Sequence, residues 1–577
     1  MIDYSRFDSA IGLNWYDADP NLRQILRRKL DPEDLQWCEH ELHKIGALTG
    51  GPIAERAEIS DRNPPQLVKF DKWGEETNQI VHHPGALATK ADAWTAGISG
   101  PRLRNEAARL SRAFPQIVQS AANYMLSQAE TGMLCAIGMT SGVRLLVERY
   151  APHGLREEML ARLTAESFDE AWDGAMFLTE RTGGSDLGTL TTVAREEGDH
   201  WLLNGSKWFC SNADAALIAA LARPDGAQEG TKGIALFVVP KFRRDGRRNG
   251  ISIRRLKDKL GTRVVPTAEA DFVDAEAYLL AADTDSNDPA RDGRGINRMM
   301  EMVNESRHGV AVMALGIMRR CLLESAIFAS HRMAFGRCLW DLPMMREMLV
   351  AMIVELEAAA ALVFESAGEG PIARLLTPVA KLRATRRGVE LASQAVEVHG
   401  GNGYIETWPV ARQLRDAQCH TIWEGSENII CLDIIRAFRD ERVMRAVFER
   451  FEAALGTSDP AVSEAREIVA KSMGELREAL LFFSRAERNV AELRARAFGN
   501  YLADTAQAAL LLEEASWELR TTGNARKALI AKLFARAHLS SARARGIISN
   551  DRAALDFFEP LLGYGNIDRA AVASISC

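Results

Sequence analysis

Glu424 is the residue of this sequence best placed for proton chemistry. It lies between Trp423 and Gly425 in the segment TIWEGSEN. A carboxylate beside an indole and a glycine turn loses hydration, which disfavours its charged form and raises its basicity toward the level needed to remove a proton from carbon. The alternative is that Glu424 only favours the start of a helix near Ser426, where acidic residues are common. We predict that Glu424 is a catalytic base.

A second polar segment lies far upstream, between Met176 and Asp186. Its sequence, MFLTERTGGSD, runs from an apolar strand into a turn rich in glycine and hydroxyl groups. The exposed backbone N–H groups of such a turn can hold an anion or the polar edge of a ring. Taken alone, it indicates only a polar turn.

Three further segments complete an ordered series: KWFCS at Lys207–Ser211, RMAFG at Arg332–Gly336 and HGGNGY at His399–Tyr404. With the first two segments, this series resembles the motifs of the FAD-dependent acyl-CoA dehydrogenase superfamily over roughly residues 100 to 435. Five motifs in the same order and at matching spacing are far more specific than any one of them.

The resemblance implies roles for individual residues. Glu424 stands where the family keeps the base that removes the α-proton of an acyl-CoA thioester, while the β-hydrogen leaves as hydride to the flavin. Thr179 and Ser185 match family contacts to the flavin, and Arg332 matches an arginine that reaches FAD phosphates across a subunit interface, a task suited to a planar cation with several donors. The cofactor-binding residues implied in this way are Met176, Thr179, Gly184, Ser185, Phe209, Ser211, Arg332, Phe335, Gly401, Ser426 and Asn428.

Two arginines also have plainer interpretations. Without the motif, Arg332 would be interpreted as a solvated charge on a helix. Arg307, at the family spacing for an arginine near the catalytic base, could instead form an ion pair with Glu301 or Glu305 on its own helix. Some relatives take their base from this helix, but the matching residue here is Ser306, so Glu424 keeps the role.

The sequence departs from the family pattern in two places. Glu397 replaces a glutamine of the Gln-x-x-Gly-Gly element, and Leu342-Pro343 replaces a glutamine expected after the RMAFG segment. A carboxylate close to an FAD phosphate is repelled unless it is countered. The segments EVHGG at Glu397–Gly401, IWEGSEN at Ile422–Asn428 and LKDKLG at Leu256–Gly261 are together most similar to the AidB-type alkylation-response branch. That branch is known for FAD binding, weak dehydrogenase activity and a proposed DNA-protective role.

Composition bounds the remaining possibilities. The chain has 577 residues, 47% of them apolar, and a net charge of −7, which gives no global attraction to nucleic acid or anionic membranes. Its eight cysteines form no CxxC pair, which argues against a zinc site and for a reducing cytoplasm. We expect no metal ion, no transmembrane segment and, because the N-terminus shows no basic-then-apolar pattern, no secretion or import signal.

The fold expected is mainly α-helical with a central antiparallel β domain. Tyr124, Met125 and Leu134 recur at helical spacing, whereas the Asn204-Gly205 pair between aromatic and aliphatic arms predicts a β-hairpin. The resulting domains are an N-terminal helical domain with an extension (1–171), a β-barrel or sandwich (172–284), a four-helix bundle carrying FAD and the catalytic base (285–439), and an extra C-terminal helical domain (440–577).

The extra domain holds a locally basic window, in which apolar residues alternate with cations. The plain interpretation is a solvated helix face; the alternative is a surface for DNA phosphates, an anionic membrane or a second subunit. The nucleic-acid candidates are Arg526, Lys527, Lys532, Arg536 and Arg543.

Two functions therefore compete. The first is an FAD-dependent acyl-CoA dehydrogenase of fatty acid metabolism, with an electron-transferring flavoprotein as acceptor and, from the crossing of Arg332, a homo-oligomer, by family habit a homotetramer. The second is an AidB-like flavoprotein that binds nucleic acid and has little dehydrogenase activity.

Overall fold

The computed structural model describes residues 1–540 and 552–575. By internal packing the chain divides into two compact units. Unit 1 comprises Met1–Ala54, Gln116–Ala129 and Val310–Cys577, and unit 2 comprises Glu55–Pro115 and Glu130–Gly309. Helix α9 (Gly295–His331) passes from unit 2 into unit 1.

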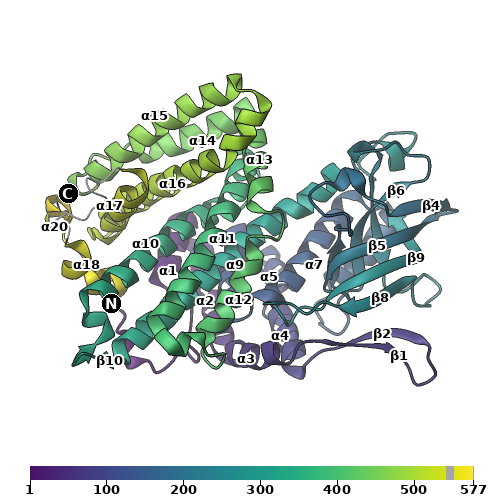
Figure 1. Ribbon diagram of the computed structural model, residues 1–577, viewed down its shortest axis with the longest axis horizontal. Coiled ribbons are helices and arrows are strands. Elements are labelled where there is room, and N and C mark those ends of the chain that lie inside the picture. The colour runs from purple at the N-terminus through teal and green to yellow at the C-terminus, as the bar shows by residue number, and fades with distance from the viewer. Residues whose placement is uncertain (541–551, 576–577) are drawn as a thin grey trace. The chain divides into compact units, whose positions relative to one another are not determined.

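Unit 2 contains the central sheet, with teal strands in Figure 1. The strands follow the order β3-β6-β4-β5-β9-β7, β8 pairs with β9, and a further pairing of β6 with β7 closes the sheet on itself. The predicted β domain is therefore confirmed as a barrel. The strands are β3 (Gly174–Phe177), β4 (Val193–Glu197), β5 (His200–Ser211), β6 (Leu217–Pro224), β7 (Ala235–Pro240), β8 (Ile251–Leu256) and β9 (Thr267–Leu279).

Two details of the sheet differ from the sequence-based expectation. The pairings of β6 with β3 and with β4 are parallel, while the others are antiparallel. The Asn204-Gly205 pair does not form a hairpin turn; it lies inside β5, where the register with β9 shifts between Leu203 and Gly205. Gly205 has φ of +155°, and a Cβ there would lie 2.6 Å from Thr192 Oγ1. The glycine therefore serves a close backbone approach rather than a turn.

Helices and a hairpin complete unit 2. An apolar core joins α7 and α8 to the barrel through residues such as Val143, Leu155 and Leu236, and α9 adds Met302 to it. The remaining elements are α3 (Ala54–Arg62), β1 (Gln66–Phe70), β2 (Glu76–Val81), α4 (Pro84–Thr95), α5 (Arg102–Arg109), α7 (Thr131–Tyr150) and α8 (His153–Leu163).

Unit 1 is helical. Helix α2 starts at Pro32 because Asp31 accepts hydrogen bonds from the backbone N–H groups of Glu33 and Asp34 while Pro32 occupies the first helical position, where proline is favoured. The main helices are α1 (Pro20–Lys29), α2 (Pro32–Leu48), α6 (Gln116–Ala129), α10 (Pro343–Glu365), α11 (Pro371–His399), α12 (Pro409–His420) and α13 (Glu427–Phe438).

The C-terminal part of unit 1 adds α14 (Glu441–Ala454), α15 (Ser463–Arg485), α16 (Arg488–Thr521) and α17 (Arg526–Leu539), drawn in green to yellow in Figure 1. Helix α16 packs against α10, α11 and α13 as well as against its own neighbours. The short helices α18 (Ala553–Asp556), α19 (Phe558–Leu562) and α20 (Arg569–Ser574) follow. The extra C-terminal helices are thus confirmed, and they belong to the same compact unit as α10 to α13.

Candidate functional site

The turn after β3 is built around Thr179. The Thr179 carbonyl oxygen accepts a hydrogen bond from the backbone N–H of Trp208 at 2.9 Å, which ties the turn to β5. Gly183 has φ of +124°, and a Cβ on Gly184 would lie 2.5 Å from Thr179 Oγ1. Glycine is therefore required at Gly184 for the turn to fold over the threonine, and it leaves Thr179 half-buried and Ser185 exposed.

A buried carboxylate holds this turn in place. Glu180 accepts hydrogen bonds from the backbone N–H groups and hydroxyls of Thr191 and Thr192, at 2.5 to 3.1 Å. It also forms an ion pair with Lys207, whose Nζ donates to Glu180 Oε1 at 2.9 Å. Burial opposes ionisation, but the Lys207 charge and these donors outweigh it and lower the pKa of Glu180 to about 2. Glu180 is not among the residues predicted for the site, although an acidic residue next to Thr179 and a lysine two residues before Phe209 are a signal for such a pair.

Phe209 and Ser211 lie on β5, directly after this anchor. The register with β9 shifts between Lys207 and Cys210, and Phe209 is left 55% exposed. The Lys257 ammonium lies 3.8 Å from the Trp208 ring centroid and 4.7 Å from that of Phe209. Ser211 Oγ lies 3.0 Å from Thr267 Oγ1. An exposed aromatic ring, nearby hydroxyls and a glycine turn suit a planar heterocycle with a polar edge, so unit 2 fits the isoalloxazine contacts that the resemblance implies. Met176 is half-buried in β3, two residues before the turn.

The loop that carries Glu424 lies in unit 1, between α12 and α13. Glu424 has φ of +56° and Gly425 has φ of +109°. The left-handed region is uncommon for residues other than glycine, and such strain persists where the surrounding structure imposes it, often at functional sites. The Trp423 ring lies 6.0 Å from the ring of the buried His420, and Glu424 is half-buried. The loop therefore holds a carboxylate in a fixed, strained and partly desolvated position.

A buried lysine on α11 holds the backbone of this loop. Lys381 is fully buried, and its ammonium donates to the carbonyl oxygens of Thr421 at 3.3 Å and Gly425 at 2.5 Å, on either side of Glu424. Burial, with a smaller effect of the Lys381 charge, lowers the pKa of His420 to about 3, so this imidazole is neutral. The N-cap position of α13 is Ser426 rather than Glu424, which disfavours the helix-start interpretation of Glu424.

Ser426 and Asn428 open α13 and are both exposed. Among the described residues, the Ser426 side chain makes no capping hydrogen bond. Arg496 of α16 donates to Asn428 Oδ1 at 2.8 Å and lies 3.5 Å from Glu427, which also pairs with Arg386 at 2.7 Å.

Arg332, Phe335 and Gly401 are exposed elsewhere in unit 1. Phe335 and Gly336 both have positive φ and form the turn of a small hairpin, β10 (Met333–Ala334) and β11 (Arg337–Cys338), which leaves the Phe335 side chain 92% exposed. Pro343, one of the departures from the family pattern, starts α10 at a position where proline is favoured. The other departure, Glu397, is exposed on α11. That Arg332 reaches a neighbouring subunit stays a prediction.

Arg307 is buried on the unit 2 part of α9, where it donates to Asn304 Oδ1 at 3.1 Å. Glu301, one alternative partner, instead accepts from Arg149 at 2.7 Å and from the Tyr150 hydroxyl. Burial and this hydrogen bond raise the pKa of Tyr150 to about 12.

In the described part of the basic window, three of the four candidate cations are buried, which corrects both the nucleic-acid and the solvated-face interpretations for Arg526, Lys527 and Lys532. Arg526, Lys527 and Lys532 are at most 4% exposed. Glu357 pairs with Arg526 at 2.6 Å and Lys527 at 2.8 Å, and Glu464 pairs with Lys532 at 3.1 Å and Arg536 at 2.6 Å. These cations pair with carboxylates far away in the sequence, the buried Glu357 and the half-buried Glu464. Arg543 lies outside the described residues.

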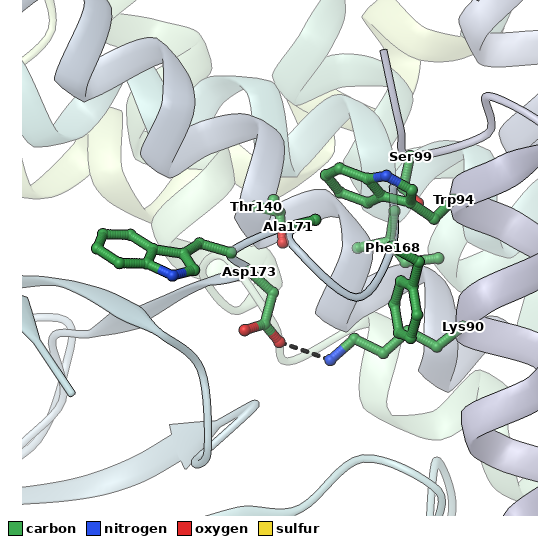
Figure 2. Close-up of a pocket in the computed structure, with 9 residues that line it drawn as sticks. Lys90, Trp94, Ser99, Thr140, Phe168, Ala171 and Asp173 are labelled. Carbon is green, nitrogen blue, oxygen red and sulfur yellow. Dashed lines mark hydrogen bonds and ion pairs between the residues drawn. The ribbon is translucent and has the colours of Figure 1, made fainter. Parts of the chain in front are cut away.

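A small cavity of about 110 Å³ lies elsewhere in unit 2 (Figure 2). Trp94 and Phe168 form apolar walls, and an ion pair between Lys90 and Asp173 at 2.5 Å closes one side. None of the residues predicted for the site lines this cavity. Within the described ranges, no helix has the length and apolar character to cross a membrane, and no group of metal-binding side chains is found.

Three family models match the chain. "Adaptive response protein AidB N-terminal domain" matches residues 8–170, "Acyl-CoA dehydrogenase, middle domain" residues 175–275, and "Acyl-CoA dehydrogenase, C-terminal domain" residues 293–438.

Individual relatives agree with these matches. The chain is 30% identical to acyl-CoA dehydrogenase family member 11 of Caenorhabditis elegans, over 81% of this chain and 78% of that protein. It is 32% identical to the putative acyl-CoA dehydrogenase AidB of Escherichia coli, over 80% and 86%. The crystal structure of C. elegans ACDH-11 in complex with C11-CoA superposes with a TM-score of 0.83 at 28% identity, over 94% and 95% of the two chains.

Proposed function

Because the chain belongs to the acyl-CoA dehydrogenase family, we propose that it is an FAD-dependent enzyme that removes hydrogen from the α and β carbons of an acyl-CoA thioester. The observation that carries this proposal is Glu424, a half-buried carboxylate in a left-handed backbone conformation. A protein that only binds a ligand has no need of a carboxylate held under strain, whereas a base for a carbon acid needs partial desolvation and a fixed position.

The residues of the chain have separate tasks in this reaction. Glu424 accepts the α-proton. Thr179, Ser185 and Ser211 offer hydrogen bonds to the polar edge of the flavin, and Phe209 offers an aromatic face. FAD supplies the hydride acceptor for the β-hydrogen. Arg332 is assigned to the phosphates of FAD in a neighbouring subunit, which makes the protein a homo-oligomer, and an electron-transferring flavoprotein is the proposed acceptor.

The buried partners keep these groups in place. Glu180 and Lys207 lock the turn of Thr179 to β5, and Lys381 holds the carbonyl groups on both sides of Glu424. Such fixed positioning lowers the reorganisation needed at the moment of reaction. Since the similar C. elegans protein was solved with C11-CoA, medium-length acyl chains are the first substrates to test.

An AidB-like role in nucleic-acid binding is the second candidate, favoured by the match to the AidB N-terminal domain. Burial of Arg526, Lys527 and Lys532 argues against the site that the sequence suggested for it. Binding to DNA would need another surface on a chain whose net charge is −7.

The test is an anaerobic titration of the purified yellow protein with acyl-CoA thioesters of short, medium, long, branched and aromatic chains, followed by flavin absorbance. We expect bleaching with at least one class. Absence of bleaching with every thioester would reject the dehydrogenase assignment. DNA retention that weakens steeply with salt would then favour the second candidate.

A further inference from the structure

Helix α16 of the C-terminal domain packs against α13, the helix that Ser426 precedes and that carries Asn428 in its first turn. Gly499 lies at this contact, where an added Cβ would lie 3.0 Å from the Leu382 side chain of α11 and 3.4 to 3.5 Å from those of Cys431 and Ile434 of α13. The backbone of α16 at Gly499 is therefore within side-chain contact of both helices. Gly499 is one turn after Arg496, so this contact brings the guanidinium of Arg496 to the first turn of α13.

Arg496 changes the charge of that turn. The Glu427 carboxylate alone would repel a phosphate, and the pair with Arg386 at 2.7 Å only neutralises it. Arg496, 3.5 Å from Glu427, makes the group of three net positive. Its side chain remains 55% exposed and that of Arg386 45%, so both guanidinium groups retain donors facing solvent.

The hydrogen bond from Arg496 to Asn428 Oδ1, at 2.8 Å, also orients the amide. With the oxygen of Asn428 occupied, its NH₂ group is left to donate outward. The Ser426 hydroxyl, which caps nothing among the described residues, is exposed beside it. An amide donor, a hydroxyl and a guanidinium thus lie at the exposed start of α13, and this donor set suits a diphosphate and the sugar attached to it.

We propose that Arg496, a residue of the extra C-terminal domain, binds the adenosine diphosphate half of FAD next to Ser426 and Asn428. The inference rests on the proposed function for the identity of the cofactor. It adds a residue outside the stretch matched by the dehydrogenase models, which ends at residue 438. The C-terminal domain is then part of the cofactor site rather than an appendage.

The experiment measures the affinity of the full-length protein, stripped of cofactor, for FAD, for FMN and for ADP. Arg496→Gln should weaken FAD binding by about 10-fold or more, because a charge-assisted contact is lost, and should weaken ADP competition in parallel. Binding of FMN, which lacks the adenosine half, should not change. Arg496→Lys should restore part of the FAD affinity. The matched control is Arg494→Gln, an exposed arginine on the same helix.

Each result decides between the possibilities. Equal FAD affinity in Arg496→Gln and wild type would overturn the inference, as would an equal loss of FAD and FMN binding, which would indicate a structural effect. FAD binding that depends on Arg496 in a protein that no acyl-CoA bleaches would leave the inference standing and reject the proposed activity. A wild-type protein that binds no FAD would overturn both.

Discussion

The Lys381 ammonium donates a hydrogen bond to the carbonyl oxygen of Gly425 at 2.5 Å, from a position on α11 that is fully buried. A second bond to the Thr421 carbonyl, at 3.3 Å, places the two contacts on either side of Glu424. The backbone of the strained loop is therefore held by the charge of Lys381, which lies 43 residues before Glu424 in the chain.

Replacing this lysine tests the anchor. Lys381→Met keeps the volume but removes both bonds, and buried carbonyl groups without donors cost about 1 to 3 kcal/mol each. We expect a lower midpoint of thermal unfolding and slower substrate-dependent flavin reduction, with FAD still bound. The pKa of His420 should rise from about 3, because the Lys381 charge contributes to its depression, while burial keeps it below that of a free imidazole. NMR titration of the ring protons measures this shift; an unchanged value would contradict the contact.

Substitutions at Glu424 separate catalysis from strain. Glu424→Gln should retain FAD and lose α-proton abstraction, with a fall in the rate of flavin reduction of about 100-fold or more. Glu424→Gly removes the same base but relieves the φ of +56°, so it should unfold at a higher temperature than Glu424→Gln. Stopped-flow reduction and calorimetry measure the two effects. Full turnover by Glu424→Gln would place the base elsewhere.

Glu180 should make the protein sensitive to acid. Its folded-state pKa of about 2 lies below the ordinary value of 4.5, so its contribution is present above pH 4.5 and is lost as pH falls toward 2. By linkage the contribution is on the order of 3 kcal/mol. The stability difference between wild type and Glu180→Gln should therefore shrink over this window. A difference that stays constant from neutral pH down to pH 2 would argue against an ionised Glu180.

The buried ion pairs of Glu357 with Arg526 and Lys527 can be tested with a double-mutant cycle. Arg526→Met leaves the buried Glu357 with Lys527 as its remaining cation and should cost about 3 to 5 kcal/mol. The double variant Glu357→Gln/Arg526→Met should lose less than the sum of the single changes. Arg552→Met is the control, because its pair with Asp556 is exposed and should matter by no more than about 1 kcal/mol. Additive effects would mean that Arg526 and Glu357 are not coupled.

Phe209 offers a contrast to Arg496. If the exposed ring on β5 supports the flavin itself, Phe209→Ala should weaken FMN and FAD binding alike, whereas Arg496→Gln should affect FAD alone. Fluorescence titration with both cofactors compares the two variants. A selective loss of FAD binding in Phe209→Ala would place Phe209 on the adenosine side instead.

Several features could be predicted from the sequence because they depend on short segments. Asp31-Pro32 starts α2 because capping uses neighbouring backbone groups. The run Ile234–Val239 lies almost entirely in β7, and its residues are all buried, because a continuous apolar run favours burial on both faces of a strand. The family resemblance also depends on local motifs, and it was confirmed by the matches to the family models and to AidB.

Other features could not be read from local sequence. The Asn204-Gly205 pair suggested a turn, but a close approach to Thr192 placed it inside a strand. The basic window suggested a surface. Instead, Arg526 pairs with Glu357, 169 residues away, and Arg536 pairs with Glu464, 72 residues away.

The sequence by itself determined the motif series, the kinds of element and the candidate base, because residue type and spacing act over one or two turns of chain. The tertiary structure alone decided which charges are buried, which carbonyl groups Lys381 holds and that α16 brings Arg496 beside Asn428. The reason is physical: a side chain carries its charge wherever it lies, but its energy depends on partners and solvent exposure, which are set when distant segments pack together.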